Sequence, residues 1–322
     1  MRFKRGDLNF VWLFAVIAGS VILLLAIFGA VRFGQTGVTQ QDTEIARTLA
    51  LVTEPMQAGF TSGRRSMITF ARPVLIENSC FEDSFGRNEL LVRVQERSNQ
   101  EFESTSEPIR VENKYLFISD EPSREFYVFS VPIDFAFRIA DVVIMDSQEY
   151  CFIGLDDETQ EIKSTFAVLG DYAKFGSSNC TDSSISVCFG TGGCDINVRG
   201  TCNDPQFCDN EFETGRVERA GFSLDYVGNF LYPAIFSEPM SYSCNLRRIM
   251  YRQSVLSELY LRKTDRMSVR GCSTNIASEL RSLKSTSFEL SRNLDFSALQ
   301  QIYLGTKSLK ELENRGQCRV WS

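Results

Sequence analysis

The sequence predicts an α+β protein that follows an N-terminal transmembrane helix, and three observations lead to this prediction. Residues 8–31 carry no charged side chain. Between 65 and 155, short segments alternate apolar and polar residues, which is the period of half-buried strands. From 237 onward, apolar residues recur three or four positions apart, as on one face of a helix.

The charge-free run at 8–31 is long enough to cross a bilayer, since a helix rises about 1.5 Å per residue and the hydrocarbon core is roughly 30 Å thick. A cleavable signal has a shorter apolar core, of roughly 7–15 residues. Arg2, Lys4 and Arg5 precede the run, so the positive-inside rule makes residues 1–7 a cytoplasmic basic leader. We expect a single-pass protein of the cell membrane whose bulk is extracytoplasmic.

The residues Arg5-Gly6-Asp7 directly before the run resemble the class III leader of archaeal type IV pilin-like proteins. The resemblance implies cleavage between Gly6 and Asp7, with the apolar helix retained. Asp7 stands where that family more often has Gln, and Val11 stands at the fifth mature position, where many members carry Glu. An ordinary signal anchor is the alternative interpretation.

Small residues lie on one face of the predicted membrane helix, at Ala15, Gly19, Ala26 and Ala30. Small side chains let a second helix approach closely, which suits packing against copies of the same chain. Gly and Ala are also frequent in membrane helices in general, so this face alone does not distinguish a packing interface from an ordinary membrane helix.

For the next part of the chain, the sequence predicts a stalk helix over 32–62, followed by a β-rich domain over 63–175. The polar stretch 99–108 predicts a hairpin loop, and 156–169 predicts a short helix. The predicted strands of this domain are 67–76, 89–95, 115–118, 125–132, 139–146 and 150–155.

All ten cysteines follow the apolar run, and their even number on the exported side predicts disulfides. No C-x-x-C pair occurs, which disfavours a zinc ribbon or a thioredoxin-type site. Five cysteines lie between 180 and 208, so at least one of them must pair outside that cluster. We expect a tie from Cys80 to Cys151, and ties to the C-terminal helices through the last three cysteines. The ten are Cys80, Cys151, Cys180, Cys188, Cys194, Cys202, Cys208, Cys244, Cys272 and Cys318.

Residues 176–230 predict a cysteine-rich insert and a strand. The part 176–209 is rich in Ser, Gly, Asn and Asp, which predicts a loop-heavy segment without a core of its own, and 211–222 reads as one strand. Asn179 begins an Asn-Cys-Thr glycosylation sequon.

Residues 231–322 predict a helical bundle of three helices. The first helix is expected to begin at Ser237-Glu238-Pro239 and to end at Gly271. A second is expected over 274–290, and a third over 295–314 with Asp295 as its cap. This C-terminal third resembles uncharacterised membrane-anchored proteins of small-genome archaea, which carry no known activity.

The chain contains no histidine, which excludes Ser-His-Asp and Cys-His catalysis and histidine-ligated zinc. We therefore expect no enzyme and no cofactor, and the net charge of −7 argues against a nucleic-acid partner. Two acidic groups resemble oxygen-rich Ca²⁺ loops but match no known calcium motif. The acidic side chains that could bind a cation or act in hydrolysis are Asp156, Asp157 and Glu158, then Asp204, Asp209, Glu211 and Glu213, and the pair Asp141 and Asp146.

These observations favour a cell-surface protein with a structural or interaction role, including that of a pilin-like filament subunit. Its expected partners are the lipid bilayer and either copies of itself or other envelope proteins. The alternatives are an anchored module that binds a ligand or partner, and a carboxylate-dependent envelope hydrolase.

Overall fold

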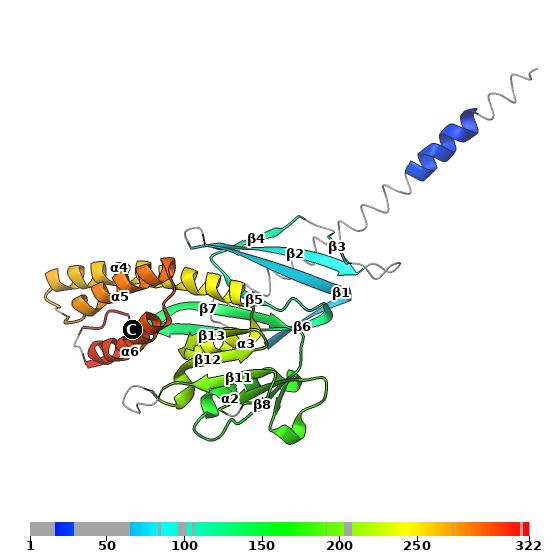
Figure 1. The fold of residues 1–322 in the computed structure, drawn as a ribbon. Coiled ribbons are helices and arrows are strands. Elements are labelled where there is room, and N and C mark those ends of the chain that lie inside the picture. Colours follow the sequence, from blue (N-terminus) through cyan, green and yellow to red (C-terminus); the bar gives the residue numbers. More distant parts are fainter. Residues whose placement is uncertain are drawn as a thin grey trace, which may run out of the picture. The chain divides into compact units, whose positions relative to one another are not determined.

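The computed structural model describes residues 17–28, 65–82, 85–95, 102–104, 107–190, 192–202, 208–272, 274–315 and 318–321 (Figure 1). The chain divides into two compact units, Met1–Arg47 and Thr48–Ser322.

In the first unit, residues 17–28 form an α-helix that contains Gly19 and Ala26. Among the described residues, no helix combines the length and the apolar content that a membrane crossing requires. The predicted cleavage site Gly6-Asp7, the residues Ala15 and Ala30, and the stalk at 32–62 lie outside the described residues.

The second unit contains a first sheet whose strands lie in the order β3-β2-β1-β6-β7-β5, with β4 also paired to β2. All its described pairings are antiparallel except that of β5 with β7. The strand β5 matches the predicted range, and the others that were predicted extend beyond theirs. The bounds are β1 Arg65–Phe81, β2 Arg87–Gln95, β3 Phe102–Ser104, β4 Ile109–Glu112, β5 Tyr115–Ile118, β6 Ser123–Phe135 and β7 Phe137–Asp146.

The long strand β1 changes partner along its length. Its first residues pair with β6, and from Val74 onward it pairs with β2. The register with β6 shifts between Thr69 and Val74, in a segment that contains Pro73. Proline has no N–H for the ladder and is found in sheets at edges and bulges, which accounts for the irregularity here.

The second sheet has the order β13-β12-β11-β10-β8-β9, with parallel pairing from β9 to β11 and antiparallel pairing from β11 to β13. The predicted strand 150–155 is β8, which ends two residues earlier. The bounds are β8 Tyr150–Ile153, β9 Ala173–Phe175, β10 Ile185–Phe189, β11 Ile196–Gly200, β12 Thr214–Arg219 and β13 Phe222–Val227.

The prediction of a loop-heavy insert at 176–209 is wrong for its middle part, because β10 and β11 are inner strands of this sheet. Val187 and Ile196 are 0 % exposed. Both strands are only five residues long and are set among Ser, Gly and Asn, so their apolar pattern is too short to stand out. The strand predicted at 211–222 is confirmed as β12, which occupies 214–219, and it forms a hairpin with β13 through a turn that contains Gly221 at φ 92°.

A short helix that the sequence did not reveal, α3 (Leu231–Phe236), lies in the core, with all six residues buried. The Phe236 ring lies 5.6 Å from Phe129 of the first sheet and 4.7 Å from Tyr150 of the second. The helix therefore fills the space between the two sheets. A six-residue apolar run cannot be assigned to helix or strand by its period alone.

The remaining helices are α2 (Gln160–Ala167), α4 (Pro239–Val269), α5 (Ala277–Arg292) and α6 (Phe296–Arg315). Glu238, rather than Ser237, stands at the N-cap position of α4, because the Ser237 hydroxyl donates to the Pro233 carbonyl. Gly271, at φ 83°, follows the end of α4 as expected. Asp295 caps α6 as expected, since its Oδ1 accepts the Ser297 N–H at 2.8 Å. Short 3₁₀ turns are η1 (Gly170–Tyr172), η2 (Ser177–Asn179), η3 (Glu211–Glu213) and η4 (Gly228–Phe230).

All ten cysteines pair, which confirms the expectation of disulfides, and one bond leaves the 180–208 cluster. The predicted tie between Cys80 and Cys151 is wrong. The position of α4 against β1 could not be foreseen from cysteine spacing, and it brings Cys244 to Cys80. The bonds are Cys80–Cys244, Cys151–Cys180, Cys188–Cys194, Cys202–Cys208 and Cys272–Cys318.

Candidate binding pocket

A cavity of about 420 Å³ opens where the turn between β6 and β7, the helix α2, the turn η3 and the helix α6 meet. Its volume falls within the range of roughly 300–1,000 Å³ that small-molecule sites occupy. Its acidic lining residues are Asp134, Glu161, Asp209 and Glu213, and its basic ones are Arg138, Lys307 and Lys310. We refer to this cavity as the polar pocket.

The turn between β6 and β7 places an opposite-charge pair at the mouth. Asp134 lies directly across the hairpin from Arg138, so their side chains project from the same face of the sheet. Ala136 takes a left-handed conformation at φ 61°, which closes this tight turn. Arg138 also forms an ion pair with Asp141.

The floor of the polar pocket is a carboxylate whose hydrogen bonds are made inside the protein. Glu213 is 9 % exposed, and its Oε1 accepts the Tyr303 hydroxyl at 2.8 Å and Lys307 Nζ at 2.5 Å. Its Oε2 accepts the Asp209 backbone N–H at 2.6 Å. Asn210 accepts the Phe212 N–H at 3.0 Å and thereby caps η3, the turn that carries Glu213.

Two tyrosines of the polar pocket keep their protons at neutral pH. Burial raises the pKa of Tyr303, and the charge of Glu213 and its hydrogen bond raise this pKa further. Burial raises the pKa of Tyr232 to about 12. Both hydroxyls are therefore neutral groups that can donate a hydrogen bond.

The rim differs from the floor because three of its charged side chains make no hydrogen bond or close ion pair, although Asp134 interacts electrostatically with Arg138 and Lys310. Asp134, Glu161 and Lys310 form no side-chain hydrogen bond or ion pair with any described residue, and all three are exposed. A second cavity of about 230 Å³ adjoins the first and shares Glu161 and Tyr232 with it. Ser130 lines this second cavity, and its buried Oγ has no hydrogen-bond partner.

Of the acidic groups noted in the sequence, only Asp209 and Glu213 meet in the polar pocket, where Lys307 forms an ion pair with each. Asp156 instead accepts hydrogen bonds from the Thr159 hydroxyl and from the backbone just before α2, and these bonds lower the pKa of its carboxyl. Asp204 lies outside the described residues. In the described part of the chain, no three potential metal ligands gather in one place.

Asp141 and Asp146 do not form a pair of facing carboxylates. They are five positions apart on β7, so their side chains project from opposite faces of the sheet. Asp141 pairs with Arg138, and Asp146 accepts the Tyr150 hydroxyl at 2.8 Å. Burial raises the pKa of Asp146, although its hydrogen bonds oppose that shift.

Asn179 lies exposed at the end of η2, where its amide donates to the Phe175 carbonyl at 2.7 Å. The next residue in the sequon, Cys180, is bonded to Cys151.

Three pocket residues that sequence reasoning missed lie on α6: Tyr303, Lys307 and Lys310. Their spacing of four and three positions places them on one helical face, which is the signal that could have revealed them. The same spacing is typical of an ordinary solvated face, so it does not distinguish a pocket.

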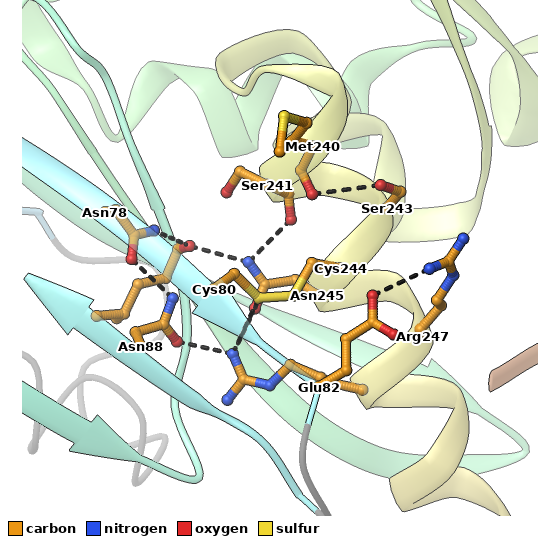
Figure 2. Close-up of a disulfide and its surroundings, with 12 residues drawn as sticks. Asn78, Cys80, Glu82, Asn88, Met240, Ser241, Ser243, Cys244, Asn245 and Arg247 are labelled. Carbon is orange, nitrogen blue, oxygen red and sulfur yellow. Dashed lines mark hydrogen bonds and ion pairs between the residues drawn. A yellow bond between two sulfur atoms is a disulfide. The ribbon is translucent and has the colours of Figure 1, made fainter. Parts of the chain in front are cut away.

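A second polar cluster lies between β1, β2 and α4, around the disulfide Cys80–Cys244. Figure 2 shows Asn78 and Asn88 facing each other beside this bond, with Asn88 donating to Asn78 at 2.8 Å. Asn245 lies next to them and donates to the Leu116 carbonyl at 3.0 Å.

Arg248 is the charged member of this cluster and is 1 % exposed. Its Nη1 donates to Asn88 Oδ1 at 2.7 Å and Asn245 Oδ1 at 2.9 Å, and its Nη2 donates to the Lys114 carbonyl at 2.7 Å. Nε donates to the Phe85 carbonyl at 3.2 Å. Burial lowers the Arg248 pKa to about 10. We call this group the Arg248 cluster.

No family model, curated protein or solved structure matches this chain.

Proposed function

We propose that the chain is a single-pass, membrane-anchored, extracytoplasmic protein of the cell surface with a structural or interaction role. One observation carries the proposal: every cysteine lies after the apolar run, and all ten pair in disulfides. Such bonds persist outside the cytoplasm, whereas cytosolic thiols are kept reduced. The charge-free run at 8–31 supplies the anchor.

The polar pocket favours an interaction role that includes binding a ligand, the alternative noted from sequence. Its buried carboxylate Glu213 is held by Lys307 and Tyr303, so it accepts hydrogen bonds rather than standing free for acid–base chemistry. This arrangement supports binding over hydrolysis.

The topology is tested by thiol labelling of the full chain in intact cells with a membrane-impermeant maleimide. The native cysteines are expected to stay unlabelled until an external reductant is added. Labelling without reductant contradicts the proposal. Phe3→Cys is the internal control and reacts only after the cells are permeabilised, whereas Ser183→Cys reacts in intact cells.

The pilin-like version of the proposal rests on Gly6-Asp7 and on the small residues of the apolar run. It predicts a mature protein that begins at Asp7 and is recovered in sheared filaments. An intact Met1 and an unpolymerised membrane fraction exclude this version and leave the plain anchored protein.

We also propose Asn179 as a glycosylation site, since its side chain is exposed on the part of the chain placed outside. Intact-mass analysis is expected to show a glycan that Asn179→Gln removes. Equal masses, apart from the substitution, contradict this assignment.

A further inference from the structure

We propose that the polar pocket binds a neutral polyhydroxylated ligand of the saccharide class. The inference rests on the interaction role proposed above and names its ligand, but it does not depend on membrane topology.

The charges of the polar pocket nearly balance, with four acidic and three basic side chains in its lining. At the floor, Lys307 already forms ion pairs with Glu213 and Asp209. A charged ligand would have to compete with these internal pairs and lose its own hydration. The balance therefore disfavours both anions and cations.

The unpaired groups at the rim require a ligand that donates and accepts. Glu161 is an acceptor only and Lys310 is a donor only, and neither side chain forms a hydrogen bond or close ion pair with a described residue, although Lys310 interacts electrostatically with Asp134. A hydroxyl group donates and accepts at once, so neighbouring hydroxyls of one molecule can serve both side chains. Hydrogen bonds to charged groups are also the stronger ones.

Two largely buried aromatic rings form part of the apolar lining of the polar pocket, against which a small part of a sugar's C–H surface can lie. Phe137 and Phe212 line it, and neither is free to turn. The Phe212 ring packs 5.2 Å from Phe189, and the Phe137 ring packs 5.4 Å from Trp321. Held in this way, the rings lose little freedom when a ligand binds.

The adjoining cavity indicates a ligand longer than one sugar ring. Ser130 Oγ is buried there without a partner, and an unsatisfied buried hydroxyl destabilises a protein. A second ring that enters past Glu161, Asn229 and Tyr232, which line both cavities, can supply the missing hydrogen bond once the buried Ser130 hydroxyl rotates toward it.

The test is a fluorescence titration of full-length protein in a detergent without a sugar headgroup. The chain has two tryptophans, so Trp12→Phe leaves Trp321, which contacts Phe137 of the polar pocket, as the reporter. The probes are glucose, galactose, N-acetylglucosamine, maltose and cellobiose, with glucuronate and glucosamine as charged counterparts of glucose. At least one neutral saccharide is expected to bind saturably and about tenfold or more tightly than either charged sugar.

Variants then locate the binding. Glu161→Gln and Lys310→Met are each expected to weaken the affinity for that saccharide about tenfold or more. Ser130→Ala weakens disaccharide binding only. Glu279→Gln, at a residue of the groove between α5 and α6 that does not line the polar pocket, leaves the affinity unchanged.

Three outcomes overturn the proposal: no saccharide of the panel binds, the charged sugars bind as tightly as the neutral ones, or Glu161→Gln and Lys310→Met bind like the unaltered chain. Glu161 and Lys310 are exposed, so these variants are expected to fold, which their circular dichroism checks. Because thiol labelling reads topology alone, failure here is distinguishable from failure of the membrane assignment.

Discussion

The Arg248 cluster and the polar pocket each place a cation against polar groups, yet they differ in whether their charged groups all have hydrogen-bond partners within the protein. Arg248 is almost fully buried, and its guanidinium donates to neutral oxygens on several elements. In the polar pocket, Lys307 neutralises a buried carboxylate, while Glu161 and Lys310 remain unpaired at the rim. A saturated cluster stabilises the fold, whereas one with spare donors and acceptors is suited to bind a ligand.

The two groups also tie the chain together differently. Arg248 connects α4 to Asn88, 160 positions earlier in the chain, and the disulfide Cys80–Cys244 reinforces the same junction covalently. At the polar pocket, hydrogen bonds and ion pairs join Glu213 to α6, and none of the five disulfides connects them. We therefore expect substitutions in the Arg248 cluster to cost more stability.

The largest effect is expected from removing the disulfide of the Arg248 cluster. Cys80 and Cys244 are 164 positions apart, so by the chain-entropy relation their replacement by Ala lowers the free energy of unfolding by about 5 kcal/mol. The matched control is Cys188 and Cys194, six positions apart, whose replacement costs about 2 kcal/mol. Urea denaturation of the oxidised proteins measures both, and equal losses would refute the long-loop role.

Replacement of Arg248 by Ala is expected to lower the free energy of unfolding by about 4 kcal/mol, because it leaves a cavity and several unpaired acceptors. The neighbouring Arg247 is a control on the same helix, since it forms a half-exposed ion pair with Glu82. Arg247→Ala is expected to cost less than about 1 kcal/mol. Similar midpoints for the two variants in urea would mean that the Arg248 cluster is not a stabilising junction.

At the floor of the polar pocket, Lys307→Met is expected to cost about 2 kcal/mol, because it leaves the buried Glu213 carboxylate without its cation. Adding Glu213→Gln removes the stranded charge and is expected to recover part of the loss. Thermal and urea unfolding of the single and double variants give this cycle. Strictly additive losses would show that the two side chains do not interact.

At the rim, Glu161→Gln and Lys310→Met are expected to change the free energy of unfolding by less than about 0.5 kcal/mol, since both side chains are exposed and form no hydrogen bond or close ion pair with a described residue. The same urea titrations provide the measurement. A large loss for either variant would give the rim a structural role and weaken its assignment to ligand binding.

The smallest effect concerns the ionisation of Tyr232, which is expected to change the stability of the protein only at alkaline pH. Tyr232 has an ordinary pKa of 10.0 that burial raises to about 12. The unfolded chain releases this proton first, so the stability that depends on it is complete below pH 10 and is lost as the pH rises toward 12. Tyr232→Phe removes this loss, and the midpoint of alkaline unfolding, followed by circular dichroism, is expected to rise. An unchanged or lower midpoint contradicts the assignment.

The sequence predicted those elements whose signals are local. The strand β2 appears in its alternating apolar pattern, the end of α4 in Gly271, and the start of α6 in Asp295. The helix α3 and the strands β10 and β11 were missed because their apolar runs are too short to distinguish a helix from a strand. Their conformations depend on packing against the rest of the protein.

The polar pocket was predicted only in part, for a similar reason. Asp209 and Glu213 stand out in the sequence as acidic residues, but the groups that turn them into a pocket lie on α6, about 90 positions later. No feature of the sequence near Glu213 indicates that Tyr303 or Lys307 lies beside it in the fold. The pairing of Cys80 with Cys244 depends in the same way on where α4 packs.

Hydrogen exchange of the full chain, with and without the tightest-binding saccharide of the panel, compares the two regions in one measurement. Without ligand, the amides of 85–90 and 114–117 around the Arg248 cluster are expected to exchange slowly, because their segments are held by buried hydrogen bonds and a disulfide. With ligand, new protection is expected at 209–213 and 228–232 of the polar pocket, while the Arg248 cluster stays unchanged. Protection that appears at the Arg248 cluster instead, or at neither region, would contradict the division between a structural cluster and a binding pocket.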